Sequence, residues 1–209
     1  MITKLYNGNP NPREIQRIVN ILSQGGIAVL PTDTLYAFVC SMQHKKSVET
    51  IAHLKGFSLK QARYSMLCQS LSQLSDFVRP MDKDTYQLLR RCLPGPYTFI
   101  MDANNNVPRN FQNANKTIGM RVPANDIFNA IVEAVGCPLI GTSVRKLDET
   151  LEKEYLTDPD LIHELYGDQV DIVVDGGIGE DLPSTVIDCS NGNIELLRAG
   201  KGEIPEELL

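Results

Sequence analysis

The sequence predicts an α/β fold in a single domain, with a twisted sheet of mixed parallel and antiparallel strands and helices on its faces. Helical patterns alternate with short apolar runs early in the chain, whereas apolar runs cluster late, and no internal repeat or low-complexity tract interrupts the 209 residues. Strands that alternate with helices favour parallel pairing, and consecutive strands favour antiparallel pairing, so we expect a mixed sheet. We assign residues 1–209 to one domain.

The N-terminal quarter predicts helices that lead into buried strands. A helix should begin at Asn11 and Pro12 and end at Gly25-Gly26, and its apolar residues recur at helical spacing: Ile15, Ile18, Val19 and Leu22. The apolar run Ile27 to Leu30 then predicts a strand. A second helix is expected from His44 to Leu54, ending at Lys55-Gly56, before a strand from Tyr64 to Cys68.

The middle of the chain predicts two capped helices and a further helix between strands. Ser70 should cap a short helix through Phe77, and Asp82 should cap one with three inward residues: Tyr86, Leu89 and Leu93. Strands are expected at Tyr97 to Met101, Thr117 to Val122 and Pro138 to Ile140, with a helix from Ile127 to Val135 closed by Gly136.

The C-terminal third predicts one helix and three strands. Leu147 to Tyr155 is acidic and polar, which indicates a surface excursion, and Asp158-Pro159 should open a helix. The strands are expected at Val170 to Val174, Thr185 to Cys189 and Ile194 to Leu197.

Composition limits the classes of function. The chain is 42% hydrophobic and contains no apolar stretch of the ~18 residues that a membrane helix needs, so we expect no membrane contact. The segment Met1 to Tyr6 meets Asn and Pro at once, which does not resemble a signal peptide, and we expect a cytoplasmic protein. A net charge of −6 argues against a protein dominated by binding to phosphate backbones but is compatible with a local basic patch.

Cysteine and histidine indicate no metal or redox centre. Five cysteines at irregular spacing lie mostly in apolar runs, which predicts buried thiols, and no histidine has a partner at ligand spacing. Asp33 and Asp188 are acidic candidates for orienting a metal ion, but one carboxylate per loop is a weak signal. We therefore assign no metal ligands.

Three hydroxyl-rich segments stand beside apolar runs. They are Pro31-Thr32-Asp33-Thr34, Gly141-Thr142-Ser143 and Pro183-Ser184-Thr185. Loops at strand ends are where α/β sheets usually bind ligands, although Ser and Thr also make turns and caps for structural reasons. Together the three segments predict a site for a small polar or anionic ligand.

Seven sequence blocks, read in order, resemble the YrdC-like family of threonylcarbamoyl-AMP synthases. The blocks are PTDTLYAFVC, LKGF, LPGPYTFIM, TIGMRVP, PLIGTS, PSTVID and RAGKGE, and they span most of the chain from about Gly25 to Gly202. LPGPYTFI, NNNVP and TIGMRVP make the chain most similar to the YciO branch of that family. The resemblance implies a YrdC-like fold with a concave basic cleft.

The resemblance also implies an activity. Family members condense L-threonine, bicarbonate and ATP to threonylcarbamoyl-AMP and pyrophosphate, with Mg²⁺ on the phosphates, for the modification of tRNA. The family has also been described as binding double-stranded RNA. The expected enzyme is therefore a nucleotidyltransferase that binds ATP and Mg²⁺, or one that acts on the adenylate. A tRNA- or double-stranded-RNA-binding module without synthase activity is the alternative.

Roles for individual residues follow from the matched blocks. The resemblance implies catalytic roles for Lys55, Arg121 and Ser143; nucleotide binding by Lys55, Arg63, Thr142, Ser143, Arg145 and Arg198; and substrate binding by Thr32, Thr34, Arg121, Gly141 and Ser184. Two positions depart from the family pattern. Phe57 replaces the second cation of a Lys-x-Arg pair, and Arg145 replaces the asparagine that follows Thr-Ser. Arg63, or Arg145 with Lys146, can return a cation to the phosphates.

Each of these residues also has a structural interpretation. Lys55 can complement the dipole at the end of a helix, and Thr32, Thr34 and Ser184 can close turns. Arg121 lies in an apolar strand and needs an anion, which can be a buried carboxylate of the protein or, as the resemblance implies, the carboxylate of the substrate. Arg198 can be a solvated charge at a strand end.

Overall fold

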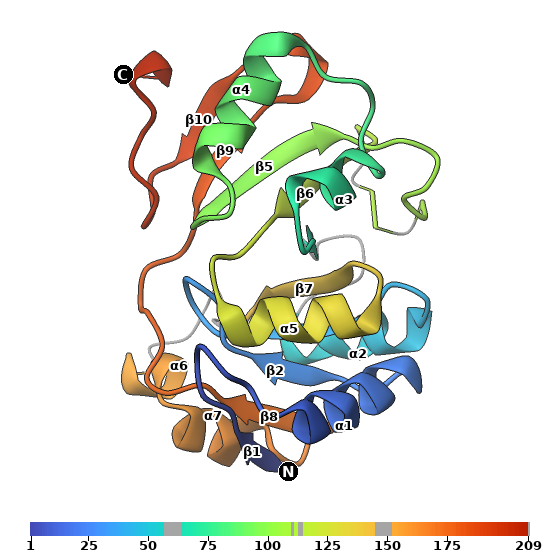
Figure 1. Ribbon diagram of the computed structural model, residues 1–209, viewed down its shortest axis with the longest axis vertical. Helices are drawn as coiled ribbons and strands as arrows, with labels where there is room; N and C mark the ends of the chain where they lie inside the picture. Colours follow the sequence, from blue (N-terminus) through green and yellow to red (C-terminus); the bar gives the residue numbers. More distant parts are fainter. Residues whose placement is uncertain (57–63, 110, 113–114, 145–151, 209) are drawn as a thin grey trace.

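The computed structural model describes residues 1–56, 64–109, 111–112, 115–144 and 152–208. Every strand in these ranges belongs to one sheet of ten strands, in the order β1-β8-β2-β3-β7-β4-β6-β5-β9-β10. The strands stack along the long axis of the molecule, with β1 at one end and β10 at the other (Figure 1). Neighbours are parallel in β1/β8, β8/β2, β4/β6 and β5/β9 and antiparallel elsewhere, so the predicted mixed sheet is confirmed.

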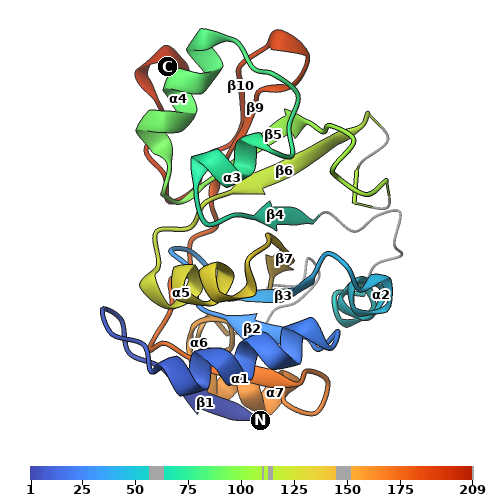
Figure 2. The same ribbon diagram turned by 45° about the vertical axis from the view of Figure 1, so that its right-hand side comes forward.

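The strands are short. Their bounds are β1 Ile2–Lys4, β2 Ala28–Leu30, β3 Ala37–Ser41, β4 Ser65–Leu67, β5 Tyr97–Asp102, β6 Thr117–Arg121, β7 Leu139–Ser143, β8 Ile172–Asp175, β9 Thr185–Asp188 and β10 Glu195–Arg198. We call β1, β8, β2, β3 and β7 the first half of the sheet and β4, β6, β5, β9 and β10 the second half. Figure 2 shows β4 between β6 and β7, where the two halves join.

Seven α-helices and two 3-10 turns surround the sheet in the described ranges. The helices are α1 Pro12–Ser23, α2 Lys45–Leu54, α3 Leu71–Ser75, α4 Lys83–Cys92, α5 Asp126–Val135, α6 Glu154–Thr157 and α7 Pro159–Tyr166. The 3-10 turns are Ser190–Gly192 and Glu206–Leu208. No helix of the described chain is long and apolar enough to cross a membrane.

Local capping explains where the helices begin. The side chains of Asn11, Ser70, Asp82 and Asp158 accept hydrogen bonds from backbone amides in the first turns of α1, α3, α4 and α7, so these four predicted starts are confirmed. At the other end of α5, Gly136 adopts φ 75°, a conformation that favours glycine.

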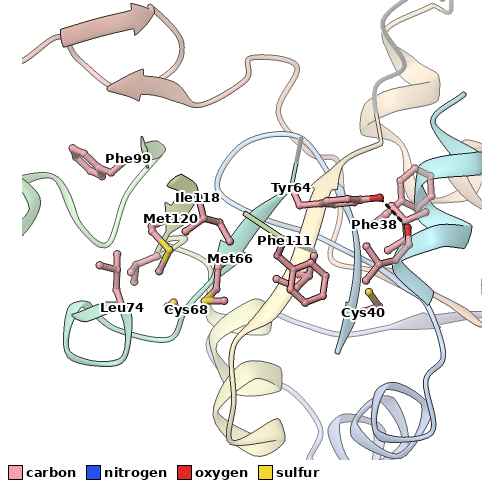
Figure 3. Packing of buried hydrophobic residues seen from close by; sticks show 14 of the residues in the cluster. Phe38, Cys40, Tyr64, Met66, Cys68, Leu74, Phe99, Phe111, Ile118 and Met120 are labelled. Atoms are coloured by element: carbon pink, nitrogen blue, oxygen red, sulfur yellow. Dashed lines mark hydrogen bonds between the residues drawn. The ribbon is translucent and has the colours of Figure 1, made fainter. Parts of the chain in front are cut away.

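Alternate residues of the strands feed two hydrophobic cores. Ala28 and Leu30 face one core together with the buried residues of α1 and α5, while Val29 faces the other core. The core that contains Val29 extends along the same face into the second half of the sheet, where it includes Met66, Phe99 and Met120 (Figure 3). The cores hold the sheet from both faces in its first half.

The covering helices leave part of the second half open. β5 and β6 bury Phe99 and Met120 on one face, but Ile100 and Gly119 on the opposite face are only half-buried. Leu67 of β4 lies on that opposite face. In the first half of the sheet, α1 and α5 cover the same face. Polar side chains of β4, β6 and β5 can therefore reach a ligand on this face.

Five sequence predictions need correction. β1, β3 and α6 were not predicted, and α6 begins within the expected surface excursion. Residues Gly141 to Ser143 lie inside β7 rather than in a loop after it, paired with β3 and partly with β4. Tyr86 is 45% exposed because α4 turns Leu88, Leu89 and Cys92 inward instead. The error at Gly141 follows from the failure to predict β3, because β7 extends to Ser143 to pair with β3.

The cysteines are buried thiols, with one exception. Cys40, Cys68, Cys92 and Cys189 are buried, and Cys137 is half-buried. Burial raises the pKa of the Cys40 thiol to about 12 and likewise raises that of Cys189 to about 12. These thiols belong to the core.

The cap of α5 yields a stability prediction. The Asn125 carboxamide oxygen accepts from the Phe128 amide at 2.9 Å, so Asn125→Ala should lower the free energy of unfolding by about 1 kcal/mol. Asn125→Asp keeps an accepting oxygen and serves as the matched control. Urea denaturation measures both; equal loss in the two variants would show that the cap is not the source of the effect.

Candidate functional site

Arg121 forms a buried ion pair with Asp33. Arg121 is the last residue of β6, and Asp33 lies in the connection between β2 and β3. The Arg121 Nη2 atom is 2.8 Å from Asp33 Oδ1, and their side chains are only 10% and 7% exposed. The other carboxylate oxygen of Asp33 accepts from the Ala124 amide at 2.9 Å. The second half of the sheet is thereby joined to a loop of the first half.

This pair answers one question that the sequence left open. The anion that Arg121 requires is supplied by a carboxylate of the protein, in agreement with the structural interpretation. Asp33 is committed to Arg121 and to a backbone amide, and Asp188 accepts from the Ser190 amide at 2.8 Å. The described residues contain no group of three or more His, Cys, Asp and Glu side chains that could hold a metal ion.

Arg121 keeps an unused donor nevertheless. Its Nε atom is buried and has no hydrogen-bond partner, whereas Nη2 donates to both Asp33 and Thr34. An unsatisfied buried donor costs about 1–3 kcal/mol, so the site favours an acceptor at Nε. Burial lowers the pKa of the guanidinium, Asp33 raises it, and the positive charge of Arg198 lowers it again. The arrangement fits an anionic ligand.

The hydroxyls of Thr32 and Thr34 form a directed chain. Thr32 Oγ1 donates to the Leu35 carbonyl at 2.8 Å, so the 3.1 Å contact between the two hydroxyls must be a bond donated by Thr34. Thr34 Oγ1 in turn accepts from Arg121 Nη2 at 2.9 Å, and the Thr34 amide donates to Thr32 Oγ1 at 3.0 Å. The Thr32 hydroxyl is saturated by the turn, and only Thr34 retains a free lone pair.

Ser184 and Arg198 come together at the other edge of the site. The guanidinium of Arg198, at the end of β10, donates to the Ser184 carbonyl from Nη2 at 2.8 Å and from Nε at 3.2 Å. The Ser184 hydroxyl lies 2.7 Å from the hydroxyl of Thr98 in β5. Thr98 precedes Phe99, which pairs with Met120 of β6. Thr98 therefore stands across from Arg121 in the β5/β6 ladder. It belongs to this group, although sequence reasoning assigned it only to a strand.

Lys55 and Ser143 form a second group. Lys55 caps α2, is 8% exposed, and donates from Nζ to the Ser143 carbonyl at 2.7 Å. The dipole interpretation of Lys55 is thus incomplete, because its ammonium also reaches the end of β7. Thr142 and Ser143 are half-buried there. Arg63, Arg145, Lys146 and Phe57 lie outside the described residues, so the displaced cation stays a prediction.

The first residue of β3 connects the two groups. Ala37 pairs with Ser143, and it is three residues after Thr34. Thr34 and Ser143 are therefore separated by no more than roughly three residues of chain and one strand spacing. Gly141, two residues before Ser143, is closely packed: a Cβ there would be 2.7 Å from Leu67 Cδ1 and 2.9 Å from the Phe38 carbonyl oxygen, so this glycine has a packing role.

Four cations contact the residues of these two groups. Arg121 pairs with Asp33, and Lys201 pairs with Glu180 and donates to the Asp33 carbonyl. Lys55 and Arg198 donate to the backbone carbonyls of Ser143 and Ser184. The concave cleft around these residues stays a prediction.

Comparison with known proteins gives a consistent result. The chain matches the Sua5/YciO/YrdC family, described as telomere recombination, over residues 20–200. It is 34% identical to Escherichia coli YciO, which is described as uncharacterized, over 201 residues that cover 96% of this chain and 95% of YciO. It is 28% identical to a threonylcarbamoyl-AMP synthase of Thiobacillus denitrificans over 83% of this chain and 89% of that protein.

Solved structures share the fold. The crystal structure of E. coli YciO superposes with a TM-score of 0.92 at 32% identity, covering 100% of this chain and 99% of that one. P. abyssi Sua5, whose structure contains L-threonine, superposes with a TM-score of 0.85 at 22% identity, covering 96% of this chain and 57% of Sua5. The predicted fold is confirmed by both.

The Arg121–Asp33 pair yields a prediction about stability. Arg121→Met leaves a buried carboxylate, and Asp33→Ala leaves a buried guanidinium, so each should lower the free energy of unfolding by about 3–5 kcal/mol. The double variant should lose less than the sum of the two, because neither orphaned charge remains. Urea denaturation of the four proteins gives the coupling.

The exposed pair Lys153–Asp181 is the matched control for this cycle. Water screens that pair, so its two single variants and its double variant should show far weaker coupling. Additive losses at Arg121 and Asp33 would contradict the assignment of this pair as the link between the halves.

Proposed function

The chain belongs to the Sua5/YciO/YrdC family, and on that premise we propose that it is a nucleotide-using enzyme that makes threonylcarbamoyl-AMP and pyrophosphate from L-threonine, bicarbonate and ATP, or acts on that adenylate. The observation that carries the proposal is the buried Arg121 with an unsatisfied Nε, close to the charge of Arg198. A donor of this kind suits a carboxylate or a carbamate. The 28% identity to a threonylcarbamoyl-AMP synthase and the L-threonine in Sua5 support the same chemistry.

In this proposal Arg121 binds the carboxylate of threonine through Nε while Asp33 keeps Nη2 in place. Thr34 offers the remaining hydroxyl lone pair at the same point. Because Asp33 is an anion, it also repels a misplaced carboxylate, which restricts binding to the Nε side of the guanidinium. Thr32 acts only through the turn, since its hydroxyl has no free bond to offer.

We assign the nucleotide phosphates to Lys55 and Arg198. Formation of an adenylate breaks the bond between the α- and β-phosphates of ATP, and negative charge grows on the α-phosphate and on the departing pyrophosphate. Lys55, beside Ser143, and the exposed Arg198 supply positive charge for these groups. Mg²⁺ bound to the phosphates would supply further neutralisation. Thr142, Ser143 and Ser184 would orient the reactants by hydrogen bonding.

The RNA-binding alternative receives less support from the described cations. Lys55 and Arg121 are both 8% exposed, and the ammonium of Lys201 is engaged with Asp33 and Glu180. A duplex backbone needs exposed charges.

A reaction assay tests the proposal. Purified protein is incubated with ATP, Mg²⁺, bicarbonate and labelled L-threonine, and both pyrophosphate and labelled adenylate are measured. We expect both products, and Arg198→Ala should reduce kcat/KM on the order of 100-fold, the effect of removing one transition-state donor. Arg79→Ala, which removes an exposed arginine from the connection between α3 and α4, is the control.

The same assay separates the alternatives. Consumption of supplied threonylcarbamoyl-AMP without its synthesis would select the reverse or hydrolytic activity. If the protein turns over no substrate while a known synthase, assayed in parallel, is active, the proposal that it is an enzyme of this kind is wrong.

A salt titration then examines RNA binding. We expect no tight binding of tRNA at 0.15 M salt, because the buried Lys55 and Arg121 cannot release counterions from a backbone. Fluorescence anisotropy at several salt concentrations measures it. Binding that is tight at low salt and weakens steeply as salt rises would favour the RNA-binding module instead.

A further inference from the structure

Lys201 contacts the substrate-binding connection from the C-terminal segment of the chain. Its Nζ atom donates to the Asp33 carbonyl at 2.9 Å and forms an ion pair with Glu180 at 3.0 Å. Its backbone amide donates to the Pro183 carbonyl at 2.8 Å. One residue therefore ties together the connection before β3, the connection before β9 and the segment after β10.

The backbone around Lys201 is fixed by one buried hydroxyl. Thr185 Oγ1 donates to the Gly202 carbonyl at 2.6 Å and accepts from the Gly200 amide at 3.0 Å, so the residues on both sides of Lys201 are held by the same atom. A Cβ on Gly200 would lie 2.4 Å from the Pro183 carbonyl oxygen, and a Cβ on Gly202 would lie 2.6 Å from the ring of Tyr97. Only glycine allows this close approach on both sides.

The atom that Lys201 contacts belongs to an important peptide group. The Asp33 carbonyl and the Thr34 amide form one planar unit, and Lys201 binds its oxygen while Thr32 Oγ1 accepts from its N–H at 3.0 Å. The side chains on either side of this unit, Asp33 and Thr34, both accept hydrogen bonds from Arg121 Nη2. The orientation of the peptide therefore sets where both acceptors of Arg121 stand.

From this arrangement we infer that Lys201 is a positioning residue: it locks the Asp33–Thr34 peptide and thereby sets the direction in which Arg121 presents Nε to the amino-acid substrate. This role rests on the proposed function. Lys201 touches neither reactant in this scheme, since its ammonium is occupied by Asp33 and Glu180. The nucleotide-binding residues Lys55 and Ser143 lie in the other group and are not connected to Lys201 by these contacts.

The inference predicts a selective kinetic defect. Lys201→Ala should raise KM for L-threonine about tenfold and leave KM for ATP within about twofold. Lys201→Arg should recover most of the loss, because a guanidinium can also donate to the Asp33 carbonyl. Steady-state kinetics with each substrate varied in turn measures the split, and an equal rise in both KM values would overturn the positioning role.

Two controls separate the contacts of Lys201. Glu180→Gln removes the ion pair but leaves the bond to the Asp33 carbonyl, so it should have little effect on either KM. Lys153→Ala removes a lysine that pairs with Asp181, the neighbour of Glu180, without touching the β2–β3 connection. A defect in Glu180→Gln equal to that in Lys201→Ala would assign the effect to the ion pair and contradict the peptide lock.

Hydrogen–deuterium exchange tests the positioning role without turnover. The Thr34 amide, bonded to Thr32, and the Ala124 amide, bonded to Asp33, should exchange about tenfold faster in Lys201→Ala than in wild type or Lys153→Ala. Unchanged exchange would overturn the inference even in an active enzyme. If the wild type makes no adenylate but the exchange rates rise as stated, the proposed function fails and the peptide lock stands.

Discussion

The buried pair between Arg121 and Asp33 is the interaction on which the candidate site depends. It joins the end of β6, in the second half of the sheet, to the connection that leaves β2 in the first half. Removing two charges from water is costly, and their attraction offsets that cost only when the remaining donors and acceptors are satisfied. Asp33 meets this condition through Ala124, whereas Arg121 leaves Nε without a partner. The Asp33 carboxylate is therefore fully hydrogen-bonded within the protein, whereas Arg121 Nε is left to donate to an anionic ligand.

The rest of the site is arranged around this asymmetry. Thr32 and Thr34 pass a hydrogen bond from Arg121 to the Leu35 carbonyl, and Lys201 holds the peptide between Asp33 and Thr34. Each bond alone is worth about 1 kcal/mol, but in a chain of bonds each donor orients the next acceptor. A loop that would otherwise sample several conformations is thereby held in one. Preorganisation of this kind favours a small ligand, because the loop does not have to be ordered at the moment of binding.

Features that depend on neighbouring residues were predictable from the sequence. Asn11, Ser70, Asp82 and Asp158 begin helices because each side chain reaches an amide two or three residues away. Strands that pair with distant segments were harder to find. β1 has three residues and depends on β8, about 170 residues later, and β3 is buried on both faces, so it shows no alternation of polar and apolar residues. The missing β3 also hid the true length of β7.

The sequence by itself determined the α/β class, four capped helix starts, the membership of the seven blocks in one family and most of the residues that meet at the candidate site. It did so because capping, periodicity and motif order are properties of the chain taken locally and in sequence. Only the tertiary structure decided what each polar side chain does. Asp33 is the partner of Arg121, the Thr32 hydroxyl completes a turn, and Lys201 donates to a peptide carbonyl 168 residues away. A hydrogen bond forms only where two atoms lie within about 3 Å of each other, and that proximity exists once the sheet has brought distant strands together.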